Sequence, residues 1–345
     1  MSSSRPAEPR VAGRTAHLRL ADPEGRWRSV RLWQEVGLPG SRLDLAPADG
    51  GWELALDLPA DVDRVEYLFV ATGPDGGTEH LLDPANPRRV GGAFGDHSVL
   101  ELPGYAPPPW LGVDAPEGTR EPLAAGGVDG QLWASAGLAG DAPAPLVVAH
   151  DGPEYDDLAA LTRCLAGLGR PVRAALLAPG PRDERYSADP AYADLLAGEV
   201  LPALRARVPV TGVLGLGASL GGLAWLHAQR RHPGVADALL LQSATFFHRR
   251  LDPQEAGFAR FGRIARFVEE VLAARTAPRP VPTVLTCGRR EENLANNRAV
   301  AQALARQGYG ARLVEVADVH NYTAWRDALQ PHLGALVARV ARAAP

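Results

Sequence analysis

Short apolar segments alternate with longer segments of helical periodicity from residue 113 to the C-terminus. Buried-strand patterns occur at 146–152 (LVVAHDG), 210–219 (VTGVLGLGAS) and 282–288 (PTVLTCG), and a helix-like stretch follows each of them. Apolar strands separated by helices are typical of a mostly parallel sheet with helices on both faces. Ligands of such sheets bind at the carboxyl ends of the strands, so we expect a functional site at that edge.

Residues 14–102 follow a different pattern. Short runs of alternating polar and apolar residues, such as AHLRLAD and WELALDL, are separated by turns rich in Gly, Pro and Asp. This pattern predicts an all-β sandwich. Residues 1–13 before it predict a disordered tail, and the prolines of residues 103–112 predict an extended linker. We therefore expect a β-sandwich joined to an α/β domain at 113–345.

Composition excludes several classes of function. The 345 residues carry a net charge of −4, which disfavours nucleic acid as a partner. All 36 basic residues are arginine, so the chain cannot form a lysine Schiff base or hold phosphate with a Walker-A lysine. Cys164 and Cys287 are far apart, and no group of His, Cys, Asp or Glu has metal-ligand spacing. We expect no metal, no other cofactor and no nucleic-acid partner.

The segment at the start of the chain lacks the apolar core of a signal peptide, and no run of 18 apolar residues is present. We therefore expect a cytoplasmic protein that does not enter a membrane. Nothing in the sequence indicates an oligomeric state.

The segment Gly217-Ala218-Ser219-Leu220-Gly221 fits the motif G-x-S-x-G and lies between a predicted strand and a predicted helix. In this setting the serine occupies a tight, strained turn, and glycines flank it because side chains would collide with neighbouring backbone. The motif predicts Ser219 as a nucleophile, with the Leu220 amide directed at the developing oxyanion. The alternative is that Ser219 is only a helix N-cap.

A serine nucleophile requires a base, which follows the acid in the chain order of such folds. Among the histidines after Ser219, His320 falls in the loop between the last strand and the last helices. A base there can reach back over the serine. We predict His320 as the base and keep His248, just after another strand, as the alternative.

The acid is expected in the loop after residues 282–288, which contains Glu291 and Glu292. A buried carboxylate bonded to the histidine holds the imidazole tautomer and stabilises the imidazolium. A carboxylate at a helix start can instead serve as a cap. We favour Glu291 as the acid, and Asp318, two residues before His320, is the alternative.

These segments together resemble the enterochelin (enterobactin) esterase family of the α/β-hydrolase superfamily. GASLGGLAWLHAQRRHP resembles the family's nucleophile segment, CGRREENLANNRAVAQAL its acid loop, and HNYTAWRDAL its histidine loop. His150-Asp151-Gly152 and the loop from Arg182 to Tyr186 are similar to two further family segments. Residues 83–87 and the prolines before Trp110 are similar to its N-terminal immunoglobulin-like early-set domain and linker.

The resemblance implies a triad of Ser219, Glu291 and His320, with a second oxyanion donor near Gly152. Residues of the surrounding loops are predicted to line the substrate pocket: Asp151, Arg182, Tyr186, Phe246, Phe247, Arg249, Tyr322 and Trp325. For each of the aromatic residues, core packing is the alternative. The chain departs from the family where Asp318-Val319 replace two glycines and where phenylalanines 246–247 replace paired tryptophans. These departures concern the substrate pocket and leave the triad in place.

Arginines gather near the predicted strand ends at positions 182, 185, 249, 250, 289 and 290. A guanidinium group makes paired hydrogen bonds to carboxylate and catecholate groups, so this set predicts an anionic substrate. The alternative is that these are ordinary surface residues in a chain without lysine.

The predicted function is hydrolysis of carboxylic esters by a serine enzyme, and the resemblance implies a ferric siderophore as the small-molecule ester. A general acyl or aryl esterase, or an acyltransferase, would keep the triad and change the substrate. A non-catalytic binding protein is the alternative from another class. We expect the N-terminal domain to act as a lid or partner over the site; glycan binding by Trp27, Trp33 and Trp52 is its alternative role.

Overall fold

The computed structural model describes residues 8–342. The chain divides into two units. The N-terminal unit extends to Ala106 and includes two later segments, Gly288–Glu291 and Ala317–Asn321, and the rest of the chain from Pro107 forms the C-terminal unit. The division after Ala106 falls inside the linker predicted at 103–112. The sequence patterns did not indicate that the two later segments group with the N-terminal unit.

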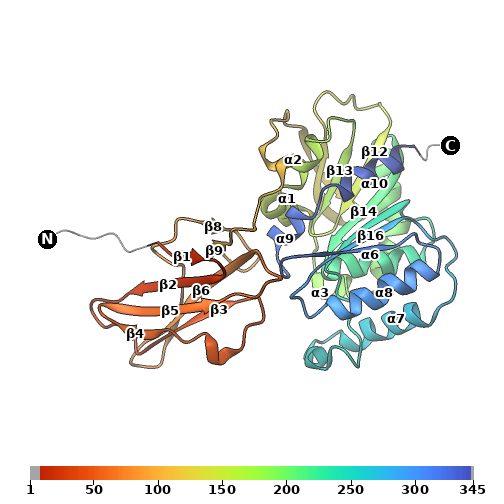
Figure 1. The fold of residues 1–345 in the computed structure, drawn as a ribbon. Coiled ribbons are helices and arrows are strands. Elements are labelled where there is room, and N and C mark those ends of the chain that lie inside the picture. The colour runs from red at the N-terminus through yellow and green to blue at the C-terminus, as the bar shows by residue number, and fades with distance from the viewer. Residues whose placement is uncertain (1–7, 343–345) are drawn as a thin grey trace. The chain divides into compact units, whose positions relative to one another are not determined.

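Two antiparallel sheets form the N-terminal unit, as expected from its all-β pattern (Figure 1). The first sheet has the order β1–β2–β5–β4, with β1 Arg10–Ala12, β2 Thr15–Ala21, β5 Gly51–Asp57 and β4 Ala46–Ala48. The second has the order β3–β6–β9–β8, with β7 paired to β6. Its strands are β3 Ser29–Gln34, β6 Arg64–Thr72, β7 Thr78–Leu81, β8 Arg89–Val90 and β9 His97–Glu101, and the 3-10 turn η1 spans Gly40–Arg42.

Period-two alternation builds the core of this unit. Leu18 and Leu20 of β2 are buried, whereas Arg19 between them reaches solvent. They share one hydrophobic core with Leu32 of β3 and Phe69 of β6, so both sheets bury one face against it. Successive side chains of a strand point to opposite faces, which is why an alternating sequence produces one apolar face and one polar face.

The ordered chain begins earlier than predicted. The tail predicted as disordered at residues 1–13 overlaps β1, which pairs antiparallel with β2 from Arg10↔His17 to Ala12↔Thr15. A strand of three residues is held by its neighbour rather than by its own sequence pattern, so the pattern did not reveal it. Residues 1–7 lie outside the described residues.

An eight-stranded mixed sheet forms the centre of the C-terminal unit, in the order β10–β11–β13–β12–β14–β15–β16–β17. Neighbouring strands from β13 to β16 pair in parallel, whereas β10 and β11 are antiparallel additions at one edge. The edge hairpin is not among the strands that the sequence predicts. The strands are β10 Thr119–Ala125, β11 Val128–Ala134, β12 Ala144–Ala149, β13 Arg173–Leu177, β14 Val210–Ala218, β15 Ala238–Gln242, β16 Thr283–Gly288 and β17 Arg312–Val316.

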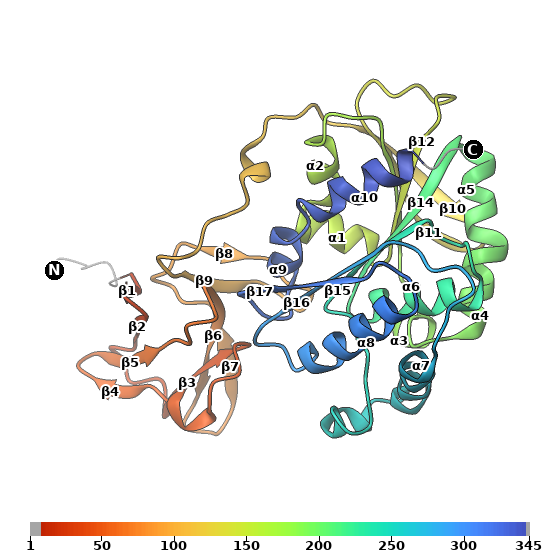
Figure 2. The same cartoon turned by 45° about the vertical axis from the view of Figure 1, so that its right-hand side comes forward.

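Helices cover both faces of this sheet, which confirms the predicted α/β architecture (Figures 1 and 2). One face carries α1 Gly152–Ala159, α2 Leu161–Ala166, α9 Tyr322–Asp327 and α10 His332–Ala341. The other carries α4 Pro190–Leu195, the π-helical η3 Leu196–Val200, α5 Leu201–Arg207, α6 Leu220–Arg231, α7 Phe261–Ala273 and α8 Leu294–Arg306. Short turns complete the unit: α3 Arg182–Arg185, η2 Pro109–Gly112 and η4 Pro253–Gly257.

Strand β12 shows why the sheet is buried on both sides. All six of its residues are buried; Leu146 and Val148 enter one hydrophobic core, and Val147 and Ala149 enter the other. A continuous apolar run is therefore the sequence mark of a central parallel strand. Within residues 8–342, no helix combines the length and apolar character needed to cross a membrane.

Candidate active site

Ser219 occupies the turn between β14 and α6. Its backbone has φ 53° and ψ −127°, which costs on the order of 1–3 kcal/mol for a residue with a side chain. A Cβ on Gly217 would lie 2.4 Å from the Gly221 carbonyl carbon, and a Cβ on Gly221 would lie 3.0 Å from His150 Cβ. The two glycines therefore allow the close approach of backbone that this strained turn requires.

The end of β15 and the loop after it are hydrogen-bonded to the backbone of Ser219. The Ser219 amide donates to the Gln242 carbonyl at 2.9 Å, and the Ser219 carbonyl accepts from the Thr245 amide at 3.1 Å. The two hydroxyl oxygens, Ser219 Oγ and Thr245 Oγ1, are 3.0 Å apart. No motif in the sequence points to Thr245, although its place three residues after a central strand is a signal that could have found it.

Two helices begin at neighbouring strand ends in this region. Leu220 opens α6 after β14, and Gly152 opens α1 after β12, which pairs in parallel with β14. The first amides of a helix have no partner within it and carry partial positive charge. A Cβ on Gly152 would lie 2.3 Å from Leu176 Cα, so no side chain fits there. Both predicted oxyanion donors thus lie at helix starts on the carboxyl edge of the sheet.

Asp151 and Arg182 form a bidentate salt bridge beside Gly152. Arg182 Nε donates to Asp151 Oδ1 and Arg182 Nη2 donates to Asp151 Oδ2, both at 2.9 Å. The Asp151 side chain is 3% exposed and that of Arg182 is 34% exposed. Burial disfavours the guanidinium charge, but the bonds to Asp151 raise the pKa of Arg182 on balance. Arg182, predicted to bind substrate, is thus already paired with a carboxylate.

His150 connects the end of β12 to the start of α6. Its Nδ1 donates to the Gly221 carbonyl and its Nε2 accepts from the Tyr192 hydroxyl, both at 2.9 Å. Tyr186, Tyr192 and Trp225 surround the ring. Burial lowers the pKa of His150 to about 4, so the imidazole is neutral near pH 7. The sequence indicates His150 only as part of a motif, whereas in the structure it supports the turn that carries Ser219.

His320 and Glu291 form a pair in the N-terminal unit. His320 Nδ1 lies 2.9 Å from Glu291 Oε2, and Glu291 Oε1 accepts from the Gly288 amide at 2.6 Å. The Glu291 side chain is 1% exposed, whereas that of His320 is 37% exposed. A buried carboxylate against Nδ1 fixes the ring tautomer and favours the imidazolium. The structure therefore brings together the predicted base and the predicted acid.

The alternatives considered for the base and acid have other partners. Glu292 is exposed, and its Oε2 accepts from Gln254 Nε2 at 3.0 Å. Asp318 is buried and accepts from Arg64 Nη2 at 3.1 Å. His248 Nδ1 accepts from the Arg250 amide at 3.2 Å. None of these contacts forms the carboxylate–histidine arrangement seen between residues 291 and 320.

The predicted aromatic residues lie mostly in packed surroundings. Tyr186 and Phe246 are fully buried, and Phe247 packs against Phe258 and Phe261. The Tyr322 hydroxyl donates to Glu154 at 2.8 Å. These contacts favour core packing, which the sequence also allowed, for the two phenylalanines.

Two further predicted residues bond to nearby side chains. Trp325 Nε1 donates to Ser243 Oγ at 2.9 Å. Arg249 forms an exposed ion pair with Glu269. Within residues 8–342, no group of three or more His, Cys, Asp or Glu side chains is arranged to hold a metal ion.

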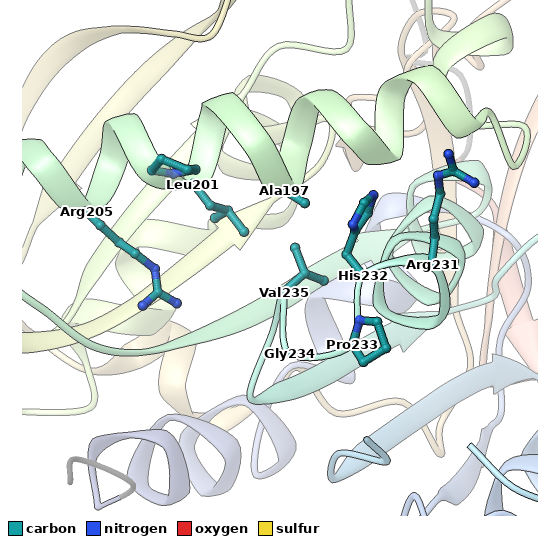
Figure 3. Close-up of a pocket in the computed structure, with 9 residues that line it drawn as sticks. Ala197, Leu201, Arg205, Arg231, His232, Pro233, Gly234 and Val235 are labelled. Carbon is teal, nitrogen blue, oxygen red and sulfur yellow. The ribbon is translucent and has the colours of Figure 1, made fainter. Parts of the chain in front are cut away.

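A surface cavity of about 480 Å³ lies away from these residues (Figure 3). Its wall comes from η3, from α5, from the last residue of α6 and from the segment between α6 and β15, including Arg205, Arg231 and Val235. That segment precedes β15, so the cavity is at the amino end of this strand, opposite the edge that carries Ser219. Arg231 is paired with Asp194 at 2.6 Å, and the cavity belongs to the outer surface rather than to the candidate site.

Solved structures share this fold across nearly the whole chain. The enterochelin esterase of Shigella flexneri matches with a TM-score of 0.75 and 19% identity, covering 97% of this chain and 96% of that one. A Shigella flexneri enterobactin esterase structure obtained in the presence of enterobactin gives 0.73 and 19%, covering 94% and 93%. The ferric enterobactin esterase of Salmonella typhimurium gives 0.69 and 20%, covering 97% and 96%.

No protein-family model matches the chain, and no curated protein matches its sequence. The structural matches confirm the family resemblance drawn from the motifs as a likeness of fold. At this level of identity, the substrate and the catalytic residues have to be argued from the residues of this chain.

Proposed function

We propose that this protein is a serine hydrolase of carboxylic esters, with Ser219 as nucleophile, His320 as base and Glu291 as the acid that orients the base. The observation that carries the proposal is the 2.9 Å contact between His320 Nδ1 and the buried Glu291 carboxylate. A histidine bound in this way presents a basic Nε2. The same chain holds Ser219 in the strained strand-to-helix turn of a nucleophile elbow, which supports the serine's role.

The proposed reaction proceeds in two halves. Ser219 Oγ attacks the ester carbonyl while His320 Nε2 takes its proton, and the amides of Leu220 and Gly152 stabilise the oxyanion. The intermediate collapses, the C–O bond breaks, and His320 returns the proton to the leaving alcohol. Water then attacks the acyl-enzyme, again giving its proton to His320. The acid leaves and Ser219 regains its proton.

The proposed substrate class is a siderophore ester of the enterobactin type, with iron carried by the substrate. Support comes from the fold shared with enterobactin esterases, one of them solved in the presence of enterobactin. Asp151, Arg182, Arg249, Tyr322 and Trp325 remain the residues proposed to contact it, whereas Tyr186, fully buried like Phe246, is not among them. We also propose that the two N-terminal sheets form an immunoglobulin-like domain.

A general esterase with a smaller neutral substrate is the second candidate. It is favoured by the pairing of Arg182 with Asp151 and of Arg249 with Glu269, because a paired guanidinium attracts an anion less strongly than an unpaired one. The burial of Phe246 also removes one of the proposed aromatic contacts.

A two-substrate assay tests both candidates. The purified full chain would be given a ferric tricatecholate trilactone and, separately, a short neutral p-nitrophenyl ester. Ser219→Ala would be compared with Ser135→Ala, a control serine directly after β11, at the edge of the sheet opposite the candidate site. We expect faster cleavage of the trilactone, loss of both activities in Ser219→Ala and full activity in Ser135→Ala. Preference for the short ester would favour the second candidate. Absence of cleavage of any ester would refute the hydrolase proposal.

A further inference from the structure

The loop that carries His320 is held by strands of the β-sandwich. The Ala317 carbonyl accepts from the Asp63 amide at 3.2 Å. Val319 is 1% exposed and packs in the hydrophobic core of the N-terminal unit with Leu32 and Phe69. The backbone before His320 and the side chain next to it are therefore anchored to the sandwich.

Arg64, the first residue of β6, binds the two residues that flank Val319 and His320. Its Nη2 donates to Asp318 Oδ2 at 3.1 Å and to Asn321 Oδ1 at 3.0 Å. Its Nη1 donates to Glu66 Oε1 at 2.7 Å. The Arg64 side chain is 2% exposed, so it does not reach a substrate from solvent. One guanidinium thus connects a strand of the sandwich to the two residues that bracket the histidine and its buried neighbour.

The charge of Arg64 is well compensated. Burial opposes a charge on the guanidinium, but Asp318 and Glu66 outweigh this effect and raise the pKa of Arg64. Glu66 is itself bonded to His97 Nδ1 at 2.9 Å. A buried guanidinium with two carboxylates and an amide in its fork is rigid, because each bond requires one orientation of the planar group.

The acid loop is anchored in the same unit. Arg290, next to Glu291, donates from Nε to the Val36 carbonyl at 3.1 Å. A Cβ on Gly288 would lie 2.3 Å from the Asp318 carbonyl oxygen, so the acid loop and the histidine loop approach each other through a glycine. Both members of the base–acid pair therefore lie on loops fixed by the sandwich.

We propose that Arg64, through the loop that carries His320, is a positioning residue for the base. The inference rests on the proposed function, in which His320 must present Nε2 in one orientation. A loop free to shift by about 1 Å would lower the rate by roughly 100-fold, since proton transfer requires hydrogen-bond geometry. Arg64 acts through Asp318 and Asn321 and touches neither substrate nor His320.

The main test compares Arg64→Lys and Arg64→Met with Arg31→Lys. Arg31 on β3 makes a similar two-pronged contact with a carboxylate, Asp44, but at the surface, so its variant controls for the loss of a guanidinium. We expect kcat to fall about 10-fold in Arg64→Lys and about 100-fold in Arg64→Met, with KM unchanged. Arg31→Lys should match the wild type. Because Arg64→Met leaves buried carboxylates unpaired and can fail to fold, Arg64→Lys decides the question in that case.

A second readout does not depend on any ester. In ¹⁵N-histidine NMR spectra, assigned with His320→Gln, the His320 Nδ1 proton should lose its hydrogen-bonded shift in Arg64→Lys, because the contact with Glu291 loosens. Arg31→Lys should leave this shift unchanged. If the spectral change occurs in a protein that cleaves no ester, the positioning role stands and the proposed function fails. A folded Arg64→Lys variant with normal kcat, or with reduced kcat and an unchanged His320 signal, would overturn the inference.

Discussion

The nucleophile elbow and the base–acid pair are built in different ways. The elbow is local: Gly217, Ser219 and Gly221 lie within five positions, and the steric demands of the turn select the two glycines. The base–acid pair joins residues 29 positions apart, and the arginine that secures the histidine loop lies 254 positions from Asp318. Short-range sterics can therefore be read from a motif, whereas long-range support becomes visible only once the chain is folded.

The largest expected effect concerns the elbow. Ser219→Ala should lower kcat for ester hydrolysis by a factor on the order of 10⁶, and Ser219→Ala with His320→Ala should be no worse, because nucleophile and base act as one unit. Steady-state kinetics on the preferred ester would measure this. A double variant much slower than either single variant would show that the two residues act in separate steps.

The acid gives the next largest effect. Glu291→Gln should lower kcat by about 10⁴-fold, since an amide can no longer stabilise the imidazolium or select its tautomer. Glu292→Gln is the matched control: it is the neighbouring glutamate, exposed and bonded to Gln254, and should keep nearly full activity. The opposite ranking of the two variants would show that Glu292, and not Glu291, is the acid.

Much of this arrangement could be predicted from the sequence because it follows from repeated local patterns. The apolar run of β12 and the G-x-S-x-G turn each carry their structure within a few residues. The edge hairpin β10–β11 and strand β1 could not be predicted as readily, since their order depends on pairing with neighbours. Glu291 could be preferred over Glu292 by analogy alone; its burial and its bond to the Gly288 amide needed the structure.

Arg64 and Thr245 show most clearly which contacts the sequence could not predict. Arg64 looks like any arginine at the start of a strand, and only folding places Asp318 and Asn321 in its fork. Thr245 follows a strand as many loop residues do, and its contact with Ser219 depends on the register of β14 and β15. Long-range contacts of this kind leave no periodicity in the sequence.

The two units should respond differently to acid, beginning with the C-terminal unit. Burial lowers the pKa of His150 and His227 to about 4 each, below the ordinary value of 6.5. Between pH 7 and pH 5 the unfolded chain binds more protons at these sites than the folded one, so the free energy of unfolding decreases as the pH is lowered. We expect a loss of about 2 kcal/mol for each histidine over this interval. His150→Gln should show a shallower dependence on pH.

The N-terminal unit should show the opposite sign. Burial raises the pKa of Glu35 and Asp318 to about 6 each, and the nearby carboxylate of Glu66 adds to the rise of both. Here the folded state binds more protons between pH 7 and pH 5, so each group should add about 1 kcal/mol of stability as the pH falls. Hydrogen exchange at pH 7 and 5, corrected for the intrinsic rate, would resolve the two units. The same slope in both would contradict these pKa directions.

The smallest expected effect concerns strain at the elbow. Ser219→Gly should raise the free energy of unfolding by about 1 kcal/mol relative to Ser219→Ala, because glycine accepts φ 53° and ψ −127° without a steric cost. Urea unfolding of the two inactive variants would measure the difference. Equal stabilities would mean that the turn is less strained than its dihedral angles indicate.

Covalent labelling tests whether Ser219 is a nucleophile activated by the His320–Glu291 pair. A fluorophosphonate probe would be incubated with the full chain, and the modified residue identified by peptide mass spectrometry. We expect a single adduct on Ser219, labelling slowed by orders of magnitude in His320→Ala, and no adduct in Ser219→Ala. An unmodified Ser219 in the folded wild-type protein, or equal labelling in His320→Ala, would contradict this expectation.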